Sequence, residues 1–322
     1  MNRSAYLRDQ MATDCQHPQN DDQVCQYVSN FLQEFDWQGD QRKYFLKPQY
    51  TNGYKFDGDY TYKSWKKNEK HLEYFFADGW DHTIKMQDDT HKLISDSYIK
   101  HRPYIKTWPY FFGTYYCDMK FDLRPPVKKI NMITNRVTND RLATLYDLFD
   151  KDYINKSNVS LLNTAKEDLS EHHPNCDAQT YFADKMPYCN FETTLEQSII
   201  DAELSIVHET TITDLAICLT EKVFRLLQLP RPFVVYGSSN LIAWLEEMGF
   251  KTGSDFVDHS YDSIEDNNQR RQAVVESAYN FSWSDKLQDS FVKIADHNKA
   301  LCLSLRDQLP TQIPKILGEH SW

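Results

Sequence analysis

Charged and polar side chains stand where short apolar runs of this sequence end. One run ends in Asn135 and Arg136, and a later run ends in His208 and Glu209. If the runs are parallel strands of one sheet, these side chains gather at the edge where open α/β sheets bind their ligands. Cations, together with the free amides of helix starts, are the groups with which proteins bind phosphate. The pattern therefore predicts a site for a phosphorylated ligand.

Two cations, Arg141 and Lys222, stand near the starts of expected helices. A helix start carries partial positive charge, so a cation is locally unfavourable there. A bound diphosphate would be attracted both by the cation and by the helix start, which would offset the repulsion between them. Thr220 and Glu221 open the second helix beside Lys222. Alternatively, each cation reaches solvent or pairs with an acid such as Glu221. The residues alone leave both readings open.

Other chemistries have weaker patterns. The sequence contains neither G-x-x-x-x-G-K-[ST] nor G-x-G-x-x-G, which argues against a P-loop and a standard dinucleotide fold. The turn GSSN lacks the second glycine of a hydrolase nucleophile elbow, and we expect Ser238 or Ser239 to cap a helix instead. The stretch EHHPNC, residues 171–176, together with Cys189 fits no standard zinc spacing, so no metal site is predicted.

The elements that would position these residues alternate between strand and helix. A strand, a helix and a second strand follow one another directly, which predicts a βαβ unit with parallel strands and a right-handed crossover. Asn139 or Asp140 is the expected N-cap of the first helix. The expected strands are 128–136, 158–163, 204–209 and 232–237, and the expected helices are 138–151, 220–228, 239–248, 265–279 and 284–308.

With 322 residues, the chain is longer than one typical hydrophobic core supports, which favours two domains. Aromatic residues crowd the first of them, and a double proline, Pro125-Pro126, marks its end. The expected organisation is a helical or irregular segment at 1–40, an aromatic-rich domain at 41–125, an α/β ligand-binding domain at 126–285, and a C-terminal helix and tail at 286–322.

Charge and composition restrict the partners and the compartment. The formal net charge of −11 disfavours nucleic acid, although the lysines of KSWKKNEK, residues 63–70, leave a local basic groove possible. The seven cysteines include no C-x-x-C pair and fit reduced thiols. No apolar run is long enough for a signal peptide or a membrane span. We therefore expect a cytoplasmic protein without a membrane partner.

One long stretch of the chain resembles a known family. The segment SIVHETTITDLAICLTEKVFRLLQLPRPFVVYGSSN, together with KKINMITNRVTNDRLATLYDLF upstream, is similar to the donor-binding region of the α1,3-fucosyltransferase-like glycosyltransferases, glycosyltransferase family 10. The ending GFKTGSDFVDHSYD resembles that of similar proteins in bacteriophages and giant viruses. The resemblance covers roughly residues 126–285. It implies a GT-B-like α/β fold of two Rossmann-like domains, with the donor site in the C-terminal one.

The resemblance also implies an activity, which is inverting, metal-independent transfer of a sugar from a nucleotide-diphosphate donor, a GDP-sugar, to a hydroxyl of a glycan or another acceptor. The donor is a substrate, and no further cofactor is implied. By matching, Arg141 and Lys222 bind the diphosphate, Glu221 the ribose or guanine, and Glu209 the donor sugar. Asn135, Arg136, His208 and Thr220 complete the expected donor site.

Several points stay open. Thr210 follows Glu209 where the family has asparagine, which leaves the donor sugar unassigned. The catalytic base is expected to be a carboxylate of the N-terminal, acceptor-side domain at 41–125. One alternative is a phage glycosyltransferase that modifies a hydroxymethylated DNA base and flips it out of the duplex. A second is a non-catalytic carbohydrate-binding or structural virion protein with a degenerate transferase fold. A viral protein would work in the host cytoplasm.

Overall fold

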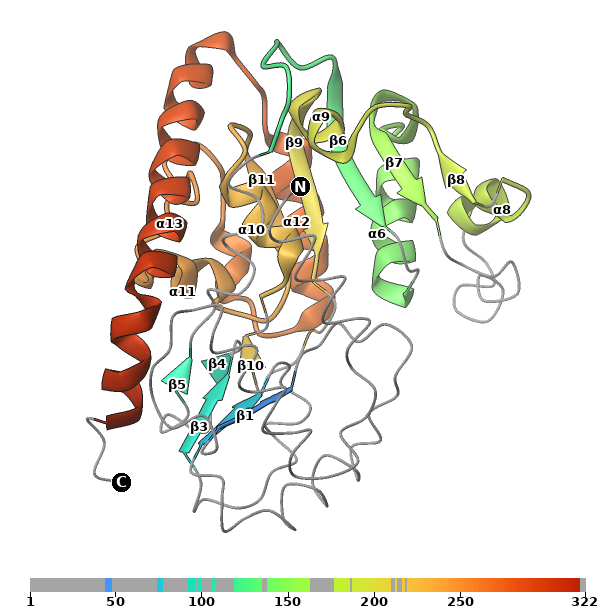
Figure 1. Ribbon diagram of the computed structural model, residues 1–322. Coiled ribbons are helices and arrows are strands. Elements are labelled where there is room, and N and C mark those ends of the chain that lie inside the picture. Colours follow the sequence, from blue (N-terminus) through green and yellow to red (C-terminus); the bar gives the residue numbers. More distant parts are fainter. Residues whose placement is uncertain are drawn as a thin grey trace. The chain divides into compact units, whose positions relative to one another are not determined.

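The chain divides into two compact units in the computed structural model (Figure 1). Unit 1 consists of residues 1–115 and 303–322, and unit 2 of residues 116–302. The expected N-terminal segment at 1–40 lies outside the described residues. The structure describes residues 44–47, 74–77, 92–95, 98–99, 106–107, 119–134, 138–162, 177–185, 187–209, 212, 216–217 and 219–318.

Unit 1 contains a sheet of parallel strands. Their order is β1-β2-β3-β5, and each strand pairs in parallel with its neighbour. Parallel neighbours require crossover connections rather than tight hairpins, so long segments join these short strands. The described strands of this unit are β1 (Tyr44–Lys47), β2 (Tyr74–Ala77), β3 (Lys92–Ser95), β4 (Tyr98–Ile99) and β5 (Lys106–Thr107).

Unit 2 is built on a five-stranded mixed sheet. Its strand order is β11-β9-β6-β7-β8, and all pairs are parallel except β7 with β8. The four strands that the sequence predicts are present, which confirms the α/β class. The strands are β6 (Lys128–Thr134), β7 (Asn158–Leu161), β8 (Tyr188–Cys189), β9 (Ala202–His208) and β11 (Phe233–Tyr236), with a short further strand β10 (Ala216–Ile217).

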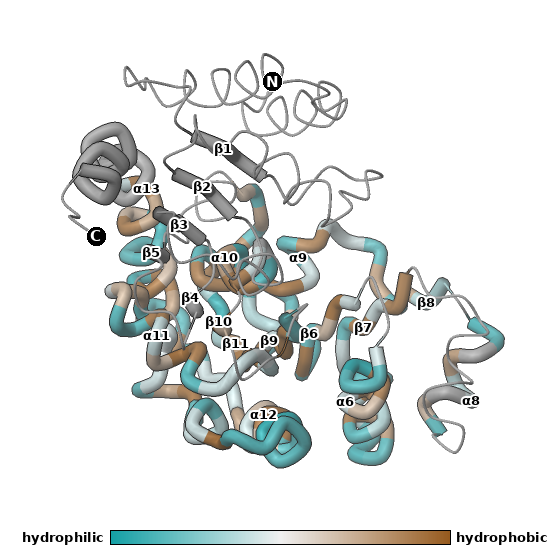
Figure 2. The backbone as a smooth tube through the Cα atoms, turned by 90° about the horizontal axis from the view of Figure 1, so that it is seen from below, coloured by the Kyte–Doolittle hydropathy of each residue, from teal (hydrophilic) through white to brown (hydrophobic). Residues whose placement is uncertain are grey.

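Helices cover both faces of this sheet. Figure 2 shows α6 and α12 on one face and α9 and α10 on the other. The helices of this part of the chain are α6 (Asn139–Asp150), α8 (Asp177–Ala183), α9 (Leu195–Ile200), α10 (Glu221–Leu227), α11 (Leu241–Glu247), α12 (Asn267–Asn280) and α13 (Gln288–Gly318), with short 3-10 turns η2 (Ile154–Lys156), η3 (Ser260–Ser263) and η4 (Asp285–Leu287).

The order of the strands creates a topological switch point, a place where the chain reverses its direction of travel across the sheet. From β6 the chain moves outward to β7, then returns past β6 to β9 and continues to β11. Strands β6 and β9 lie side by side, with Ile130 opposite Leu204 and Asn131 opposite Ser205. The connections from β6 and β9 therefore leave in opposite directions. A crevice forms at the carboxyl ends of such a strand pair, and open α/β sheets bind ligands there.

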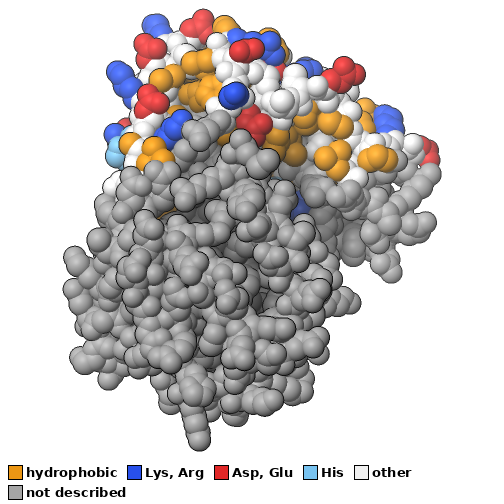
Figure 3. Space-filling view, in the orientation of Figure 1, with side chains coloured by type: hydrophobic (Ala, Val, Ile, Leu, Met, Phe, Trp, Pro, Cys, Tyr) orange, Lys and Arg blue, Asp and Glu red, His pale blue; other side chains and the backbone are white. Residues whose placement is uncertain are grey.

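The core of unit 2 follows from this layering. Every residue of β7 and β11 is buried, as expected for strands covered on both faces. Leu142, Leu145 and Leu148 of α6 are fully buried against the sheet. Burial of each such leucine contributes about 1.5–3 kcal/mol. On the face seen in Figure 3, acidic and basic side chains are interspersed over the described part of this unit.

Three helix boundaries differ from the sequence predictions. Helix α6 is capped by Thr138, whose hydroxyl accepts from Arg141 N at 3.4 Å, rather than by Asn139 or Asp140. Helix α11 follows Asn240, at φ 63°, rather than Ser238 or Ser239, because the carboxylate of Asp262 takes over the capping. Helix α13 continues to Gly318 instead of ending near Gln308.

Candidate functional site

The carboxyl edge of the unit 2 sheet brings together residues from distant parts of the chain. Strand β9 ends at His208 and strand β11 at Tyr236, and the two are register partners. Helix α6, which follows β6, places Arg141 beside them, and Arg141 Nη2 donates to the backbone oxygen of His208 at 3.4 Å. Because β6 and β9 form the switch point, this contact joins its two sides.

Glu209 and the start of α10 form the other part of this edge. The buried carboxylate of Glu209 accepts from Thr220 N at 3.0 Å and from Thr220 Oγ1. Lys222 Nζ lies 3.7 Å from Glu209 Oε2 and donates to Thr220 Oγ1 at 3.3 Å. The protein thus supplies its own anion at this helix start, and Glu209 is an acid that pairs with Lys222.

The exposure of this ion pair differs between its two members. The side chain of Glu209 is 0% exposed, whereas that of Lys222 is 26% exposed. The Lys222 side chain therefore contacts a buried carboxylate and is also partly exposed to solvent. A buried carboxylate whose oxygens accept several hydrogen bonds is a fixed anchor, and it holds the lysine in one place.

His208 is the most unusual group of the edge. Its side chain is 5% exposed, and its ring meets that of Tyr236 edge-on, with the centroids 5.0 Å apart. Among the residues that the structure describes, neither ring nitrogen has a hydrogen-bond partner. Burial lowers the pKa of His208 well below its usual value, and the charges of Arg141, Arg271 and Lys222 lower it further. The imidazole is therefore neutral at physiological pH.

Tyr236 connects β11 to the start of α6. Burial, followed by the charge of Asp140, raises the pKa of Tyr236 to about 12, so its hydroxyl keeps its proton. The guanidinium of Arg270 lies 5.9 Å from the ring centroid. That guanidinium is itself buried and donates to Gly237 O at 3.0 Å and to Glu265 O at 3.0 Å, which gives it a structural role at the end of β11.

The helices that start at this edge differ in what occupies their first amides. Asp262 fills the start of α11, accepting from Ile242 N and Ala243 N at 3.0 Å each. Burial raises the pKa of Asp262, and these hydrogen bonds partly offset that rise. Glu209 fills the start of α10, whereas α6 has the neutral cap Thr138. Of these three helix starts, that of α6 is the one capped by a neutral side chain, and Asp140 lies in its first turn.

The structure brings together most of the site residues that the sequence predicts. Arg141, His208, Glu209, Thr220 and Lys222 all lie at the carboxyl edge. Asn135 and Arg136 lie outside the described residues. Glu221 is the first residue of α10, and its side chain lies outside what the structure describes.

Sequence reasoning missed three residues of this edge. Tyr236 is the penultimate residue of the predicted strand 232–237, as His208 is of the predicted strand 204–209, so the rule that found His208 could have found it too. Asp262 and Arg271 come from later segments, and only the packing of α12 and η3 against the sheet brings them here. Arg271 is buried and pairs with Asp147 of α6, which links the two helices on this face.

The described part of the chain has neither an arranged metal-binding group nor a helix suited to span a membrane. No group of three or more His, Cys, Asp or Glu side chains is arranged there to hold a metal ion. The whole stretch EHHPNC lies outside the described residues, and Cys189 is exposed, with Sγ 3.1 Å from Phe191 O. None of the described helices combines the length and apolar character needed to cross a bilayer.

The site is thus a cationic edge at a switch point, with a buried neutral imidazole between Arg141, Arg271 and Lys222. Such an arrangement can bind an anionic, oxygen-rich ligand. Comparison with models of protein families and with curated protein sequences gives no match to this chain.

Proposed function

We propose that unit 2 binds the donor of an inverting glycosyltransferase, which moves a sugar from a nucleoside diphosphate to a hydroxyl of a glycan or another acceptor. One observation carries the proposal. Residues singled out from the sequence alone, on α6, β9 and α10, meet at the switch point of a parallel sheet. Nucleotides bind at this place in open α/β sheets. The choice of a GDP-sugar and of a GT-B arrangement rests on the family resemblance.

The charges suit the departure of a nucleoside diphosphate. When the bond to the sugar breaks, the diphosphate gains negative charge. Cations that are already fixed in place stabilise this charge without reorganisation, which is a main source of catalytic power. Arg141 is fixed by its hydrogen bond to His208 O, and Lys222 by Glu209 and Thr220. Both would lower the barrier by binding the leaving group more tightly than the intact donor.

The remaining roles follow from the same arrangement. Glu209 holds Lys222 in place, and by resemblance one edge of its carboxylate binds the donor sugar. The start of α6 would receive the diphosphate beside Arg141. A carboxylate of the acceptor-side domain would remove the proton of the acceptor hydroxyl as general base. No metal takes part in this proposed sequence of steps, as the resemblance implies.

Calorimetry of nucleotide binding tests the proposal. GDP, UDP, ADP and CMP would be titrated without added metal into the wild type, Arg141→Ala and Lys222→Ala. We expect selective binding of GDP, weakened by about 1–3 kcal/mol in each variant, the scale of a lost charge-assisted hydrogen bond. Lys129→Ala is the matched control, because Lys129 pairs with Glu203 on the surface, at the start of β6.

Three results would contradict or change the proposed function. If the folded wild type binds none of the four nucleotides, the assignment of the donor site is wrong. If GDP binds but GDP-sugars are not hydrolysed over many hours, the protein is a non-catalytic binding module. If duplex DNA binds and the affinity falls steeply with added salt, the DNA-modifying alternative gains support.

A further inference from the structure

The two histidines at the ends of β11, a half-buried one and a buried one, differ in their hydrogen bonding. At the amino end, His259 has a partner at each nitrogen, Ser254 Oγ at 3.1 Å and Phe233 O at 3.1 Å. At the carboxyl end, His208 is more deeply buried, at 5% exposure, and has a partner at neither nitrogen among the described residues. Buried polar atoms are nearly always paired, so an unpaired pair of ring nitrogens requires an explanation. A ligand that is absent from the structure supplies one.

Three described helices contribute the charges that act on His208. Helix α6 contributes Arg141, α12 contributes Arg271, and α10 contributes Lys222. The acids nearby are engaged elsewhere. Asp147 pairs with Arg271, and Glu209 pairs with Lys222 and accepts from Thr220. Asp140 acts on Tyr236, whose ring contacts His208 edge-on. The charges that act on the ring are therefore cations.

This field explains why the ring is neutral in the free protein. A protonated imidazole would add a further positive charge among three cations in a buried place. A bound diphosphate would counter this field, because its negative charges offset those of the three cations. A protonated ring then presents two N–H donors, and phosphate oxygens are acceptors.

On the basis of the proposed function, we propose that His208 binds a phosphate oxygen of the nucleoside diphosphate and takes up a proton from solvent as it does so. Binding of the diphosphate is then coupled to proton uptake, and the affinity increases as the pH falls through the neutral range. Because one proton is coupled to binding, the affinity changes by at most about tenfold per pH unit.

Calorimetry in buffers of different ionisation enthalpy measures this coupling directly. The probe is GDP-mannose, because its esterified phosphates do not titrate near neutral pH, and titrations would cover pH 6 to 8. The wild type should take up a substantial fraction of one proton per bound nucleotide. His208→Phe should take up none and bind at least about fivefold more weakly, the loss of one hydrogen bond to a charged group. His259→Gln, the matched control, should behave as the wild type.

Two variants separate a binding role from a structural one. Phenylalanine keeps an aromatic ring against Tyr236 and removes two unpaired nitrogens, so the thermal midpoint of His208→Phe should equal or exceed that of the wild type. His208→Gln retains a hydrogen-bonding group that does not titrate. It should keep part of the affinity but show no proton uptake. If His208 had only a structural role, the substitution would not separate affinity from proton uptake in this way.

The outcomes distinguish this inference from the proposed function. Nucleotide binding without proton uptake, or unchanged uptake in His208→Phe, overturns the role of His208 and leaves the proposed function standing. If no nucleotide binds, inorganic pyrophosphate serves as the probe, with the proton uptake taken as the difference between the wild type and His208→Phe. A positive difference then retains the role of His208 while the proposed function fails. No binding of either probe overturns both.

Discussion

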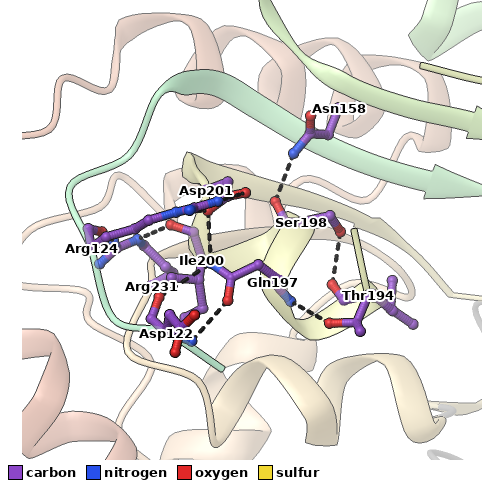
Figure 4. Close-up of polar contacts among 10 residues, drawn as sticks. Asp122, Arg124, Asn158, Thr194, Gln197, Ser198, Ile200, Asp201 and Arg231 are labelled. Carbon is purple, nitrogen blue, oxygen red and sulfur yellow. Dashed lines mark hydrogen bonds and ion pairs between the residues drawn. The ribbon is translucent and has the colours of Figure 1, made fainter. Parts of the chain in front are cut away.

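The two ends of the unit 2 sheet bury charged and polar groups in different ways. At the amino end, the protein pairs the buried charges of Arg231 and Asp201 with its own atoms (Figure 4). At the carboxyl end, cations gather around a histidine whose nitrogens lack partners among the described residues. Burial of a charge is costly unless it is paired, so the first arrangement is typical of a structural joint. The second arrangement is typical of a ligand-binding site.

Arg231 is the centre of the amino-end network. It is 1% exposed, and each of its nitrogens donates, Nε to Ile200 O at 2.8 Å, Nη1 to Pro230 O and Gln288 Oε1, and Nη2 to Arg124 O. Burial lowers the pKa of Arg231 to about 10, which still leaves it charged at neutral pH. The network joins the segment before β6 to the start of α13.

Asp201 completes this network. Its carboxylate accepts from Arg124 Nε at 2.8 Å, from Arg124 Nη2 at 2.7 Å and from Gln197 Nε2 at 2.8 Å. Its backbone oxygen accepts from Val127 N, just before β6, and from Lys128 N, at the first residue of β6. Burial raises the pKa of Asp201, but the hydrogen bonds from Arg124 and Gln197 outweigh it, and the pKa is lowered overall. Folding therefore favours the charged carboxylate, as in a structural ion pair.

The largest expected effect concerns Arg231. Arg231→Met should lower the free energy of unfolding by about 3–5 kcal/mol, because it leaves several buried acceptors without a donor. Urea unfolding monitored by circular dichroism would measure this loss. Lys129→Met, which removes an ion pair whose side chains are 42% and 18% exposed, should cost no more than about 1 kcal/mol. Equal costs for the two variants would contradict the view that the amino end is a structural joint.

A smaller effect is expected from the helix cap at the carboxyl end. Asp262→Ala removes the acceptor of Ile242 N and Ala243 N and should destabilise the protein by about 1–2 kcal/mol. Differential scanning calorimetry would register the lower midpoint. Affinity for GDP should change far less than in Arg141→Ala, since Asp262 serves α11 and not the β6 edge. A loss of nucleotide binding as large as that of Arg141→Ala would extend the site to α11.

The smallest expected effect is a change in the pH dependence of stability. His208 has a lowered pKa in the folded protein, so its contribution to stability is present above about pH 6.5, the unfolded value, and is lost as the pH falls below it. The slope is at most about 1.4 kcal/mol per pH unit. His208→Phe should therefore be less sensitive to acid between pH 7 and 5. Urea unfolding at several pH values tests this.

The same experiment has an internal reference. His259 also has a pKa lowered by burial, with the hydrogen bond to Phe233 opposing the shift, and it contributes a slope of the same sign in both proteins. The difference between the wild type and His208→Phe isolates His208. Identical slopes would mean that His208 is charged, or already paired, in the free protein.

The sequence by itself determined the elements of unit 2 and much of its candidate site. Hydrophobic periodicity is a local property, and it predicted the strands ending near Arg136, Glu209 and Gly237 to within about two residues. The rule that ligands lie beyond strand ends selected Arg141, His208 and Lys222 without knowledge of the strand order. Both inferences use only neighbours along the chain.

Only the tertiary structure decided the order of the strands and the partners of the charges. Periodicity cannot tell that β9 returns to the far side of β6, and this return creates the switch point. It cannot tell that Lys222 pairs with Glu209, or that Asp262 caps α11. These contacts join residues that are distant in sequence. They depend on how α10, η3 and α12 pack against the sheet, because ion pairs and caps form between side chains that packing has already placed.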